Sequence, residues 1–260
     1  STAMGWLTEA SGWYSTAMGR ETTASGSHST SMGYNTQASG DWSTAMGIGT
    51  TASGEYSTAM GGSTVASGAY SSASGGATTA KDYLSFVIGV HNKTDETPNP
   101  DSFSYQNTAF VIGNGGYDSE GNYVGTSDTF SNAFEVLFDG TTTIAGDLNI
   151  NSDARLKANI ISLGATLSKL LQIDGKTYTM KKDTNHKKKR GLLAQDIEKV
   201  FPELVTENND IKSVNYQGLV PVLINAMKEQ DEVIRSQDQR LDQQQKQIDN
   251  LKLMLEKLLK

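Results

Sequence analysis

Small apolar and hydroxyl residues repeat with a fixed spacing through the first third of the chain. Glycine occurs every seven residues from Gly5 to Gly75, and alanine lies two positions before each glycine, except that Ser31 replaces it once. Serine or threonine follows three positions after each glycine, from Thr8 to Thr78. Met-Gly and Ser-Gly pairs alternate, so the full period is fourteen residues. Three positions held in register over this length predict a repeat structure rather than a disordered linker.

Each fourteen-residue unit predicts one coil of a parallel β-solenoid. Glycine at every seventh position would destabilise a long helix by about 1 kcal/mol each, whereas it suits a tight turn with positive φ after a short strand. Two strand-turn units make one coil, and equivalent residues of successive coils stack. We expect Thr16 and Met18 to share one strand face, and Ser15 and Ala17 the other. The methionines would then form an apolar stripe, and the alanines would allow close backbone approach.

The composition predicts that the chain shares its core with other copies. Only 36% of the residues are hydrophobic and 26 are glycine. One chain has too few apolar side chains to form a core of its own, so we expect several copies to associate. The net charge of −7 gives no general attraction to nucleic acid or anionic membranes. We find no signal peptide and no run of 18 apolar residues, so this chain is not expected to insert into a membrane. The absence of cysteine excludes disulfides and thiol chemistry.

The STAMG and TASG units of residues 1–80 resemble the head repeats of YadA-like trimeric autotransporter adhesins. The resemblance implies a homotrimer of left-handed parallel β-rolls that forms a head or shaft. Such heads bind varied surfaces, so the resemblance identifies no ligand. The sequence begins within a repeat at Ser1, and we expect it to be a fragment.

Residues 81–150 predict a small β module that acts as a tip or neck. Strand-like runs at residues 84–90, 108–114, 132–138 and 141–146 alternate with turn-rich loops. The module resembles the antiparallel β modules that precede the C-terminal domain in many phage tail fibres. Aromatic side chains are dense here, and they either stack on sugar rings at a receptor-binding tip or, as is more usual, form a shared core.

Several motifs of residues 151–260 resemble the intramolecular chaperone of endosialidases and other phage tail fibres, the peptidase family S74. They are Ser-Asp-Ala-Arg-Leu-Lys (152–157), Gly-Leu-Leu-Ala-Gln-Asp (191–196), Val-Phe-Pro-Glu-Leu-Val (200–205), Val-Asn-Tyr (214–216) and an apolar helix from Leu219 to Met227. The resemblance implies an α+β chaperone domain over residues 151–228. Such a domain assembles the upstream β-fibre as a trimer.

The same resemblance implies a single-turnover autopeptidase. Carried over to this chain, Ser152 is the nucleophile, Lys157 is its base, and the Asn151–Ser152 bond is cut. A desolvated lysine can serve as a base because burial lowers its pKa. A separation of five positions does not guarantee contact within one chain, so we expect the trimer to supply the geometry. The alternative stays open that Ser152 only caps a helix starting near Asp153. In addition, many members of this family have a histidine beside the glycine that corresponds to Gly191, whereas this chain has Arg190 there.

The chain is predicted to end in a trimeric coiled coil over residues 229–260, at the end of a long helix. Apolar residues alternate at spacings of three and four, and three glutamines occupy core positions. The apolar positions are Leu223, Met227, Ile234, Leu241, Ile248, Leu251, Leu255 and Leu258, and the polar ones are Gln230, Gln237 and Gln244. The glutamines weaken such a coil but help to fix its register.

Other candidate sites are given structural interpretations. The basic residues Lys181–Lys182 and Lys187–Arg190 surround His186 and predict a solvated hairpin loop near Asp183 and Asn185, with no nucleic-acid partner. His28, His91 and His186 show no ligand spacing, so we expect no metal and no cofactor.

The sequence therefore predicts a mostly β protein with an α-helical C-terminus that works as a homotrimeric fibre or adhesin. We expect it on a virion tail fibre or a bacterial surface appendage, where it presents a surface to a cell-surface glycan or protein receptor. The alternative is a self-processing Ser/Lys autopeptidase whose released fragment is the functional product. No part of the chain is large enough to predict a glycan-cleaving groove with paired carboxylates.

Overall fold

The structure of the protein is a computed structural model that describes residues 1–94, 97–118, 120–126, 129–181 and 186–258. The chain divides into two compact units, Ser1–Ile150 and Asn151–Lys260. We call them unit 1 and unit 2 and describe each by itself.

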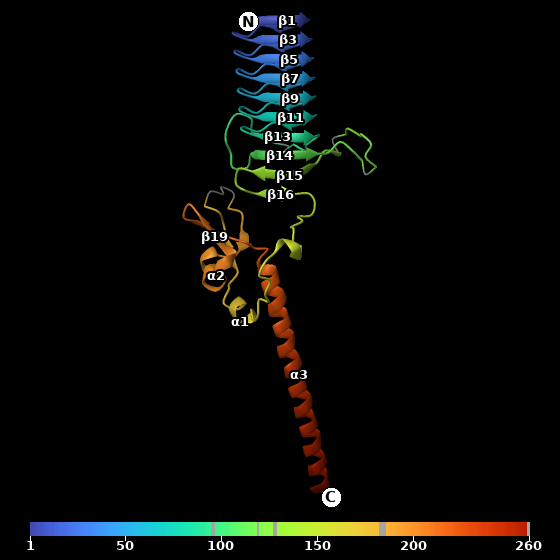
Figure 1. Cartoon of the computed structure of the whole chain (residues 1–260), viewed down its shortest axis with the longest axis vertical. Coiled ribbons are helices and arrows are strands. Elements are labelled where there is room, and N and C mark those ends of the chain that lie inside the picture. Colours follow the sequence, from blue (N-terminus) through green and yellow to red (C-terminus); the bar gives the residue numbers. More distant parts are fainter. Residues whose placement is uncertain (95–96, 119, 127–128, 182–185, 259–260) are drawn as a thin grey trace. The chain divides into compact units, whose positions relative to one another are not determined.

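Unit 1 is built on a parallel β-solenoid, as the fourteen-residue period predicts (Figure 1). Each coil contributes one long strand to a ten-stranded sheet and one short strand to a six-stranded sheet. The long strands are Thr2–Trp6 (β1), Thr16–Arg20 (β3), Thr30–Tyr34 (β5), Thr44–Ile48 (β7), Thr58–Gly62 (β9), Ser72–Gly76 (β11) and Phe86–Val90 (β13). The short strands are Glu9–Ala10 (β2), Thr23–Ala24 (β4), Gln37–Ala38 (β6), Thr51–Ala52 (β8), Val65–Ala66 (β10) and Thr79–Ala80 (β12).

The interior of the solenoid contains only small side chains. Alanines from Ala17 to Ala80 are fully or almost fully buried, and Val87 and Val111 continue their cluster. Serines and threonines also face inward, and Ser31, which replaces alanine, lies 2.7 Å from Thr36 through the two hydroxyl oxygens. Among the described residues, six buried hydroxyls have no hydrogen-bond partner, on Thr22, Ser29, Thr50, Ser57, Thr64 and Thr78. Buried unpaired hydroxyls cost free energy, so this core stabilises a single chain weakly.

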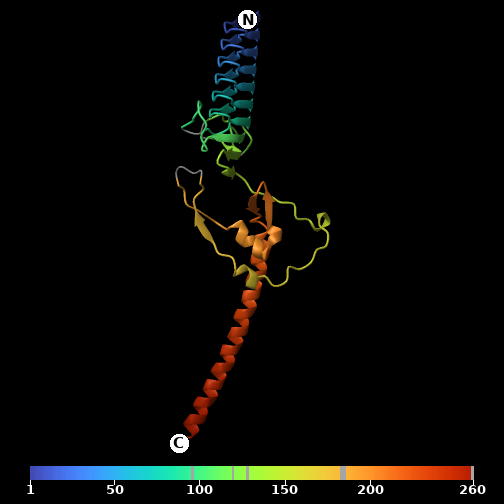
Figure 2. The same cartoon turned by 90° about the vertical axis from the view of Figure 1, so that its left-hand side faces the viewer.

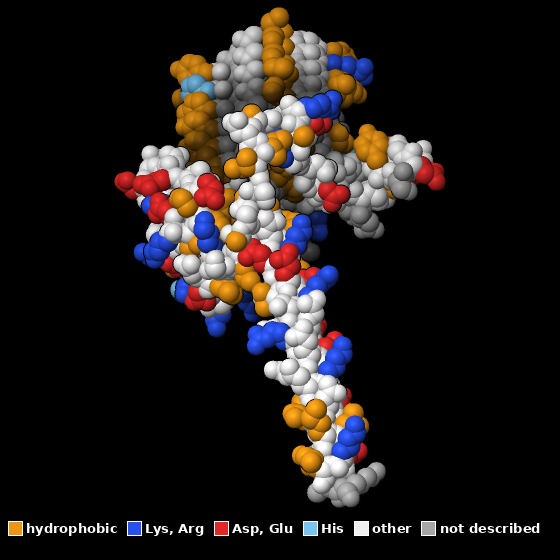
Figure 3. Space-filling model, turned by 60° about the horizontal axis from the view of Figure 1, so that its bottom comes forward, with side chains coloured by type: hydrophobic (Ala, Val, Ile, Leu, Met, Phe, Trp, Pro, Cys, Tyr) orange, Lys and Arg blue, Asp and Glu red, His pale blue; other side chains and the backbone are white. Residues whose placement is uncertain are grey.

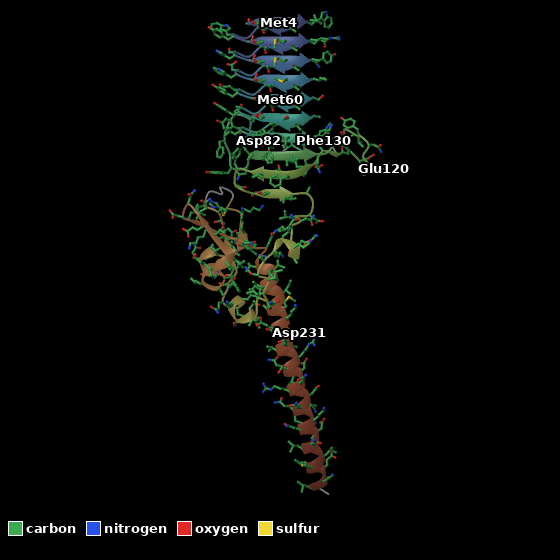
Figure 4. The ribbon with its side chains drawn as sticks, viewed as in Figure 1. Met4, Met60, Asp82, Glu120, Phe130 and Asp231 are labelled. Carbon is green, nitrogen blue, oxygen red and sulfur yellow. The ribbon has the colours of Figure 1, made fainter. Side chains whose placement is uncertain are left out.

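The methionines stack on the outward face of the ten-stranded sheet. Met4, Met18, Met32, Met46 and Met60 are in register on successive strands. The same column continues through Ser74 and Ile88 to Ile112. We call this column, from Met4 to Ile112, the Met column; Met4 and Met60 are labelled in Figure 4. Met4 and Met60 remain 58% and 41% exposed, so the predicted apolar stripe exists and faces away from the interior of its own coil.

The glycines serve close packing more than the predicted turns. A Cβ added to Gly19 would lie 2.1 Å from the carbonyl oxygen of Gly33, and one added to Gly26 would lie 2.0 Å from that of Gly40. Positive φ occurs at the Met-Gly glycines, but the left-handed turn residues lie two positions after each glycine and are mostly other residue types, such as Tyr14 and Glu21. The expectation that glycine supplies the positive φ of the turn is therefore wrong for the Ser-Gly pairs. At these pairs glycine is required because the backbones of successive coils touch.

An aromatic ladder runs along one turn of the solenoid, and the sequence analysis missed it. The rings of Tyr14, His28, Trp42, Tyr56 and Tyr70 stack with centroids 4.7 to 5.3 Å apart. Figure 3 shows this column of hydrophobic side chains interrupted by a histidine. The signal was an aromatic side chain at every fourteenth position. Because each ring covers its neighbour's face, the ladder stiffens the turn and offers mainly ring edges to other molecules.

The solenoid continues past Ala80, where the sequence repeat ends, and is then closed by antiparallel strands. Strand β13 pairs in parallel with β11 and with Thr108–Asn114 (β14). Only the last two strands, Asn132–Leu137 (β15) and Thr142–Ile144 (β16), pair antiparallel. The four predicted strands are confirmed, but the all-antiparallel arrangement is wrong for the first two. Antiparallel pairing suits the end of a solenoid because it stops further stacking.

Two asparagine side chains imitate peptide groups where the coils end. The Asn92 amide accepts a hydrogen bond from the Thr79 N–H at 2.7 Å and donates to the Thr79 carbonyl at 3.0 Å. The Asn132 amide bonds Lys93 in the same way, at 2.9 and 3.1 Å. The buried Asn92 amide therefore takes the place of a further strand on the six-stranded sheet.

Unit 2 combines two short hairpins with helices around one apolar cluster. Its elements are a 3₁₀ turn at Ala154–Leu156 (η2), Leu167–Leu170 (α1), Lys176–Tyr178 (β17), Lys189–Gly191 (β18), Ala194–Val200 (α2), a 3₁₀ turn at Pro202–Leu204 (η3), Val205–Asn208 (β19), Ile211–Val214 (β20) and Leu219–Leu258 (α3). Ile197, Phe201, Leu204, Leu219 and Val222 form the cluster. Figure 2 shows α2 beside the N-terminal end of α3. The predicted turn near Asp183 and Asn185 lies outside the described residues.

Helix α3 is a single helix of 40 residues, as the sequence predicts. Beyond its first two turns no residue of its described part is buried. The predicted core positions Ile234, Leu241, Ile248 and Leu251 are between 46% and 62% exposed in the single chain. An exposed apolar stripe of this length is typical of a helix that packs against other helices.

Candidate functional site

The structure brings Ser152 and Lys157 together within one chain. The Lys157 amine donates a hydrogen bond of 2.6 Å to the Ser152 hydroxyl oxygen. This contact corrects the expectation that only the trimer supplies the geometry, because a single turn of 3₁₀ helix, η2, separates the two residues. The two side chains therefore lie within hydrogen-bond reach of each other, which is the first condition for a serine nucleophile and a lysine base.

Asp153, and not Ser152, caps this turn. Its carboxylate accepts a hydrogen bond of 2.8 Å from the Arg155 backbone N–H. The same carboxylate pairs with the Arg155 guanidinium, the shortest contact being 2.6 Å. The hydrogen bonds from the Arg155 side chain and backbone hold the pKa of the Asp153 carboxyl below its ordinary value. The Ser152 hydroxyl is therefore not used as the predicted helix cap.

The pair lies in an exposed segment rich in large apolar side chains. Ser152 and Lys157 are both exposed in the single chain. Around them, six large apolar side chains are more than half exposed: Leu148, Ile150, Leu156, Ile160, Ile161 and Leu163. Such a segment gains free energy when another surface covers it.

A carboxylate on α3 holds the start of α1. Glu229 accepts hydrogen bonds from the backbone N–H groups of Thr166 and Leu167, the latter at 3.2 Å. Thr166 in turn donates its hydroxyl to the Val222 carbonyl at 3.0 Å. These backbone donors, Thr166 first, hold the pKa of the Glu229 carboxyl below its ordinary value. The sequence analysis missed this link, because Thr166 and Glu229 are 63 positions apart and neither belongs to a recognised motif.

We expect Glu229→Gln to weaken unit 2 at neutral pH and to remove part of its acid sensitivity. A folded-state pKa below the ordinary value of 4.5 means that the carboxylate stabilises the fold above that pH. The contribution is lost as the pH falls through the folded-state pKa. Thermal unfolding of the full chain between pH 3 and 7, followed by helix circular dichroism, measures this. Glu232→Gln on the same helix is the control, and an equal pH dependence in both variants would contradict the assignment.

The glycine and tyrosine of two matched motifs pack together in unit 2. The Tyr216 hydroxyl accepts a hydrogen bond of 2.8 Å from the Leu192 N–H. A Cβ on Gly191 would lie 2.8 Å from that hydroxyl oxygen and 3.2 Å from the Tyr178 ring. These motif residues therefore hold the hairpin β17–β18 against the segment before α3, and their role is structural.

The remaining candidate chemistry is limited. Within the described ranges, no three His, Asp or Glu side chains gather so as to hold a metal ion. None of the helices described is long and apolar enough to cross a membrane. The described basic residues Lys187, Lys188 and Lys189 lie in or just before β18, and Lys189 pairs with Tyr178 on the neighbouring strand β17.

The fold and the site define a β-solenoid followed by a unit of short hairpins and helices with a Ser/Lys pair at its start. Residues 1–22, 24–50, 38–64 and 52–78 match the family model of the YadA head domain repeat. Residues 152–206 match the model described as the chaperone of endosialidase. The chain thus joins YadA head repeats to a chaperone-of-endosialidase domain, and this matched segment begins at Ser152.

Several curated relatives are similar to parts of the chain. The long tail fiber protein Gp37 of Salmonella phage S16 is 36% identical over 83 residues, which are 28% of this chain and 11% of that protein. The protein of the same name from Enterobacteria phage M1 is 32% identical over 116 residues, or 39% of this chain and 46% of that protein. The chain thus spans from about a tenth to about half of these relatives. No solved structure matches it.

Proposed function

We propose that the chain is part of a homotrimeric virion tail fibre, in which unit 2 assembles three copies of unit 1 and then separates by self-cleavage. The relatives named long tail fiber proteins and the two matched family models support the fibre. Assembly rests chiefly on the outward face of the ten-stranded sheet.

That face carries an apolar column, interrupted once at Ser74, that no other described part of unit 1 covers in the single chain. The Met column runs along seven coils and onto β14 in register. Thr16 and its equivalents lie beside it on the same face. The interior of the solenoid contains small side chains, so a larger apolar core has to form outside it, and the Met column offers large apolar side chains in register on successive coils. Three copies that bring this face to a common axis would bury it.

Burial of the exposed apolar stripe of α3 would favour a trimer of unit 2 independently of unit 1. In the heptad pattern Met227, Ile234, Leu241, Ile248 and Leu255 occupy equivalent positions, one every seven residues. Figure 3 shows hydrophobic side chains gathered near the C-terminal end of this helix. Three parallel helices would hold the C-terminal ends of three unit 1 chains in the same register. Unit 2 would thereby lower the entropic cost of aligning three repetitive coils, which can otherwise pair out of register.

Cleavage follows from the Ser152–Lys157 pair once assembly desolvates it. The neutral Lys157 amine takes the proton of the Ser152 hydroxyl, whose oxygen attacks the Asn151 carbonyl carbon. The peptide C–N bond breaks, the lysine returns the proton to the Ser152 nitrogen, and an ester joins Asn151 to the serine oxygen. One water then hydrolyses the ester, which leaves a carboxylate on Asn151 and a free amine on Ser152.

The loop between β14 and β15 is the surface that best fits contact with a host. Tyr117 and Tyr123 are 50% and 63% exposed and are joined by an isolated β-bridge. Glu120 lies at the end of this projecting loop, and Phe130 lies near its base (Figure 4). The rings of Tyr117 and Tyr123 meet edge to face, with their centroids 5.8 Å apart, unlike the stacked rings of the aromatic ladder. This arrangement leaves ring surface open to stack on a sugar.

We expect the double variant Tyr117→Ser, Tyr123→Ser to bind host cells at least about tenfold more weakly, because exposed aromatic anchors dominate such contacts. Binding of the full chain to intact Salmonella and Escherichia cells and to a glycan array measures this. Trp13→Ser, which removes an exposed aromatic ring from the solenoid, is the control. Unchanged binding by the double variant would exclude this loop as the receptor surface.

A further inference from the structure

Lys157 reaches Ser152 because the chain makes one complete turn between them. The Leu156 N–H donates to the Asp153 carbonyl at 3.0 Å, and the Lys157 N–H donates to the Ala154 carbonyl at 3.1 Å. Both ends of the turn are extended, with ψ of 133° at Asp153 and 148° at Lys157. Two consecutive bonds of this kind define a short 3₁₀ turn. It brings the Lys157 amine within 2.6 Å of the Ser152 hydroxyl oxygen.

A carboxylate-guanidinium clamp fastens the start of this turn. One Asp153 oxygen accepts both the Arg155 backbone N–H at 2.8 Å and its Nε at 3.0 Å. The other oxygen accepts Nε at 3.1 Å and Nη2 at 2.6 Å. The same contact raises the pKa of the Arg155 guanidinium. The clamp therefore joins the cap of the turn to a side chain in its middle.

Apart from the two backbone hydrogen bonds and the Lys157–Ser152 contact, the clamp is the interaction that holds the turn among the described residues of the single chain. All residues from Ser152 to Lys157 are exposed, so no core fixes them. Ordering the backbone of the turn and the long lysine side chain costs conformational entropy. In such a segment, hydrogen bonds from a capping side chain to the backbone are the interactions able to select one conformation.

We propose that Asp153 and Arg155 are positioning residues that hold the Lys157 amine on the Ser152 hydroxyl. The sequence alone assigns the possible cap to Ser152 and no joint role to Asp153 and Arg155. The hydrogen bonds between Asp153 and Arg155 indicate that the two residues together hold the turn that places Lys157. The consequence for cleavage rests on the proposed self-cleavage, whereas the placement of Lys157 can be measured without it.

Competitive acetylation of the full chain, read by mass spectrometry, measures the placement directly. We expect Lys157 to react several-fold more slowly than the exposed Lys181 in the wild type. In Asp153→Ala and Arg155→Ala the Lys157 rate should approach that of Lys181. Asp153→Asn should preserve part of the protection, because an asparagine oxygen still accepts the Arg155 N–H. Equal Lys157 reactivity in wild type and Asp153→Ala would overturn the proposal, whatever the cleavage result.

The cleavage rate of the same variants gives the second measurement. We expect Asp153→Ala to cleave at least about tenfold more slowly than wild type, and Asp153→Asn to recover part of the rate, with sedimentation unchanged in both. A purely structural role would lower the assembled fraction instead. Wild-type speed in an assembled Asp153→Ala chain would contradict the clamp. If wild type itself never cleaves, self-cleavage fails as a function, and the acetylation result alone decides the clamp.

Discussion

Replacing Gly61 by alanine is expected to unfold the solenoid around β9 and to lower the melting temperature of the whole chain. The added Cβ would lie 2.1 Å from the Gly75 carbonyl oxygen, and the residue has a φ of +117°. Backbone strain of this kind costs about 1–3 kcal/mol, and overpacking adds about 1–3 kcal/mol. Each coil supports its neighbours, so the damage should spread along the stack.

The neighbouring glycine provides a matched control. A Cβ on Gly62 would meet no heavy atom of the described residues within 4 Å, so Gly62→Ala should match wild type within about 1 kcal/mol. Thermal unfolding by far-ultraviolet circular dichroism and resistance to protease compare the two variants. If Gly61→Ala were as stable as Gly62→Ala, the close stacking of successive glycine backbones would be wrong.

Ser152→Ala and Lys157→Arg are each expected to slow self-cleavage at least about 10³-fold, because they remove the nucleophile and the base. Arginine preserves the charge and can still donate to the serine oxygen, but it does not lose its proton at ordinary pH. Denaturing gels should show fragments 1–151 and 152–260 for wild type and only the full-length chain for both variants. Mass spectrometry should find Ser152 at the new N-terminus.

Ser162→Ala is the control for this experiment, since Ser162 lies in the same exposed segment and away from Lys157 in sequence. It should cleave like wild type. A wild-type chain that assembles and still remains full length would remove self-cleavage from the account. Cleavage in Ser152→Ala would show that another group is the nucleophile.

The repeat allowed most of the solenoid to be predicted from sequence. Period and residue type were enough to place Met18 and Thr16 on one face and Ala17 on the other, since side chains alternate along a strand. The long helix and the four strands of residues 81–150 were also predictable from local pattern. In these elements each short segment carries its own signal.

Features that depend on contacts between coils were harder to predict. The close approach of Gly26 to Gly40 requires knowing that successive backbones touch, whereas the sequence suggested only a turn. The continuation into β13 was visible in principle, because Gly89 follows Gly75 at the repeat distance of fourteen. The coil that contains β14 is lengthened by the loop after β13, so its glycine, Gly113, departs from that distance.

The sequence predicted which residues form the candidate site, but it did not predict their geometry. The resemblance identified Ser152 and Lys157, but a motif does not show which atoms hold a turn together. The Asp153 cap and the Arg155 fork arise from a local conformation that spacing alone leaves open. The bond between Glu229 and Thr166 joins elements distant in sequence, and no local pattern predicts it.

Cross-linking across the Met column tests the central claim, that three chains bury this face together. The chain has no cysteine, so Met32→Cys in an uncleavable Ser152→Ala background places a single thiol on that face. Thr51→Cys places one on the short strand β8 of the other sheet. With a short bismaleimide, we predict covalently linked pairs from Met32→Cys alone, in particles of three times the chain mass of 27.9 kDa. A folded single-chain particle, or linkage through Thr51→Cys and not Met32→Cys, would contradict the account.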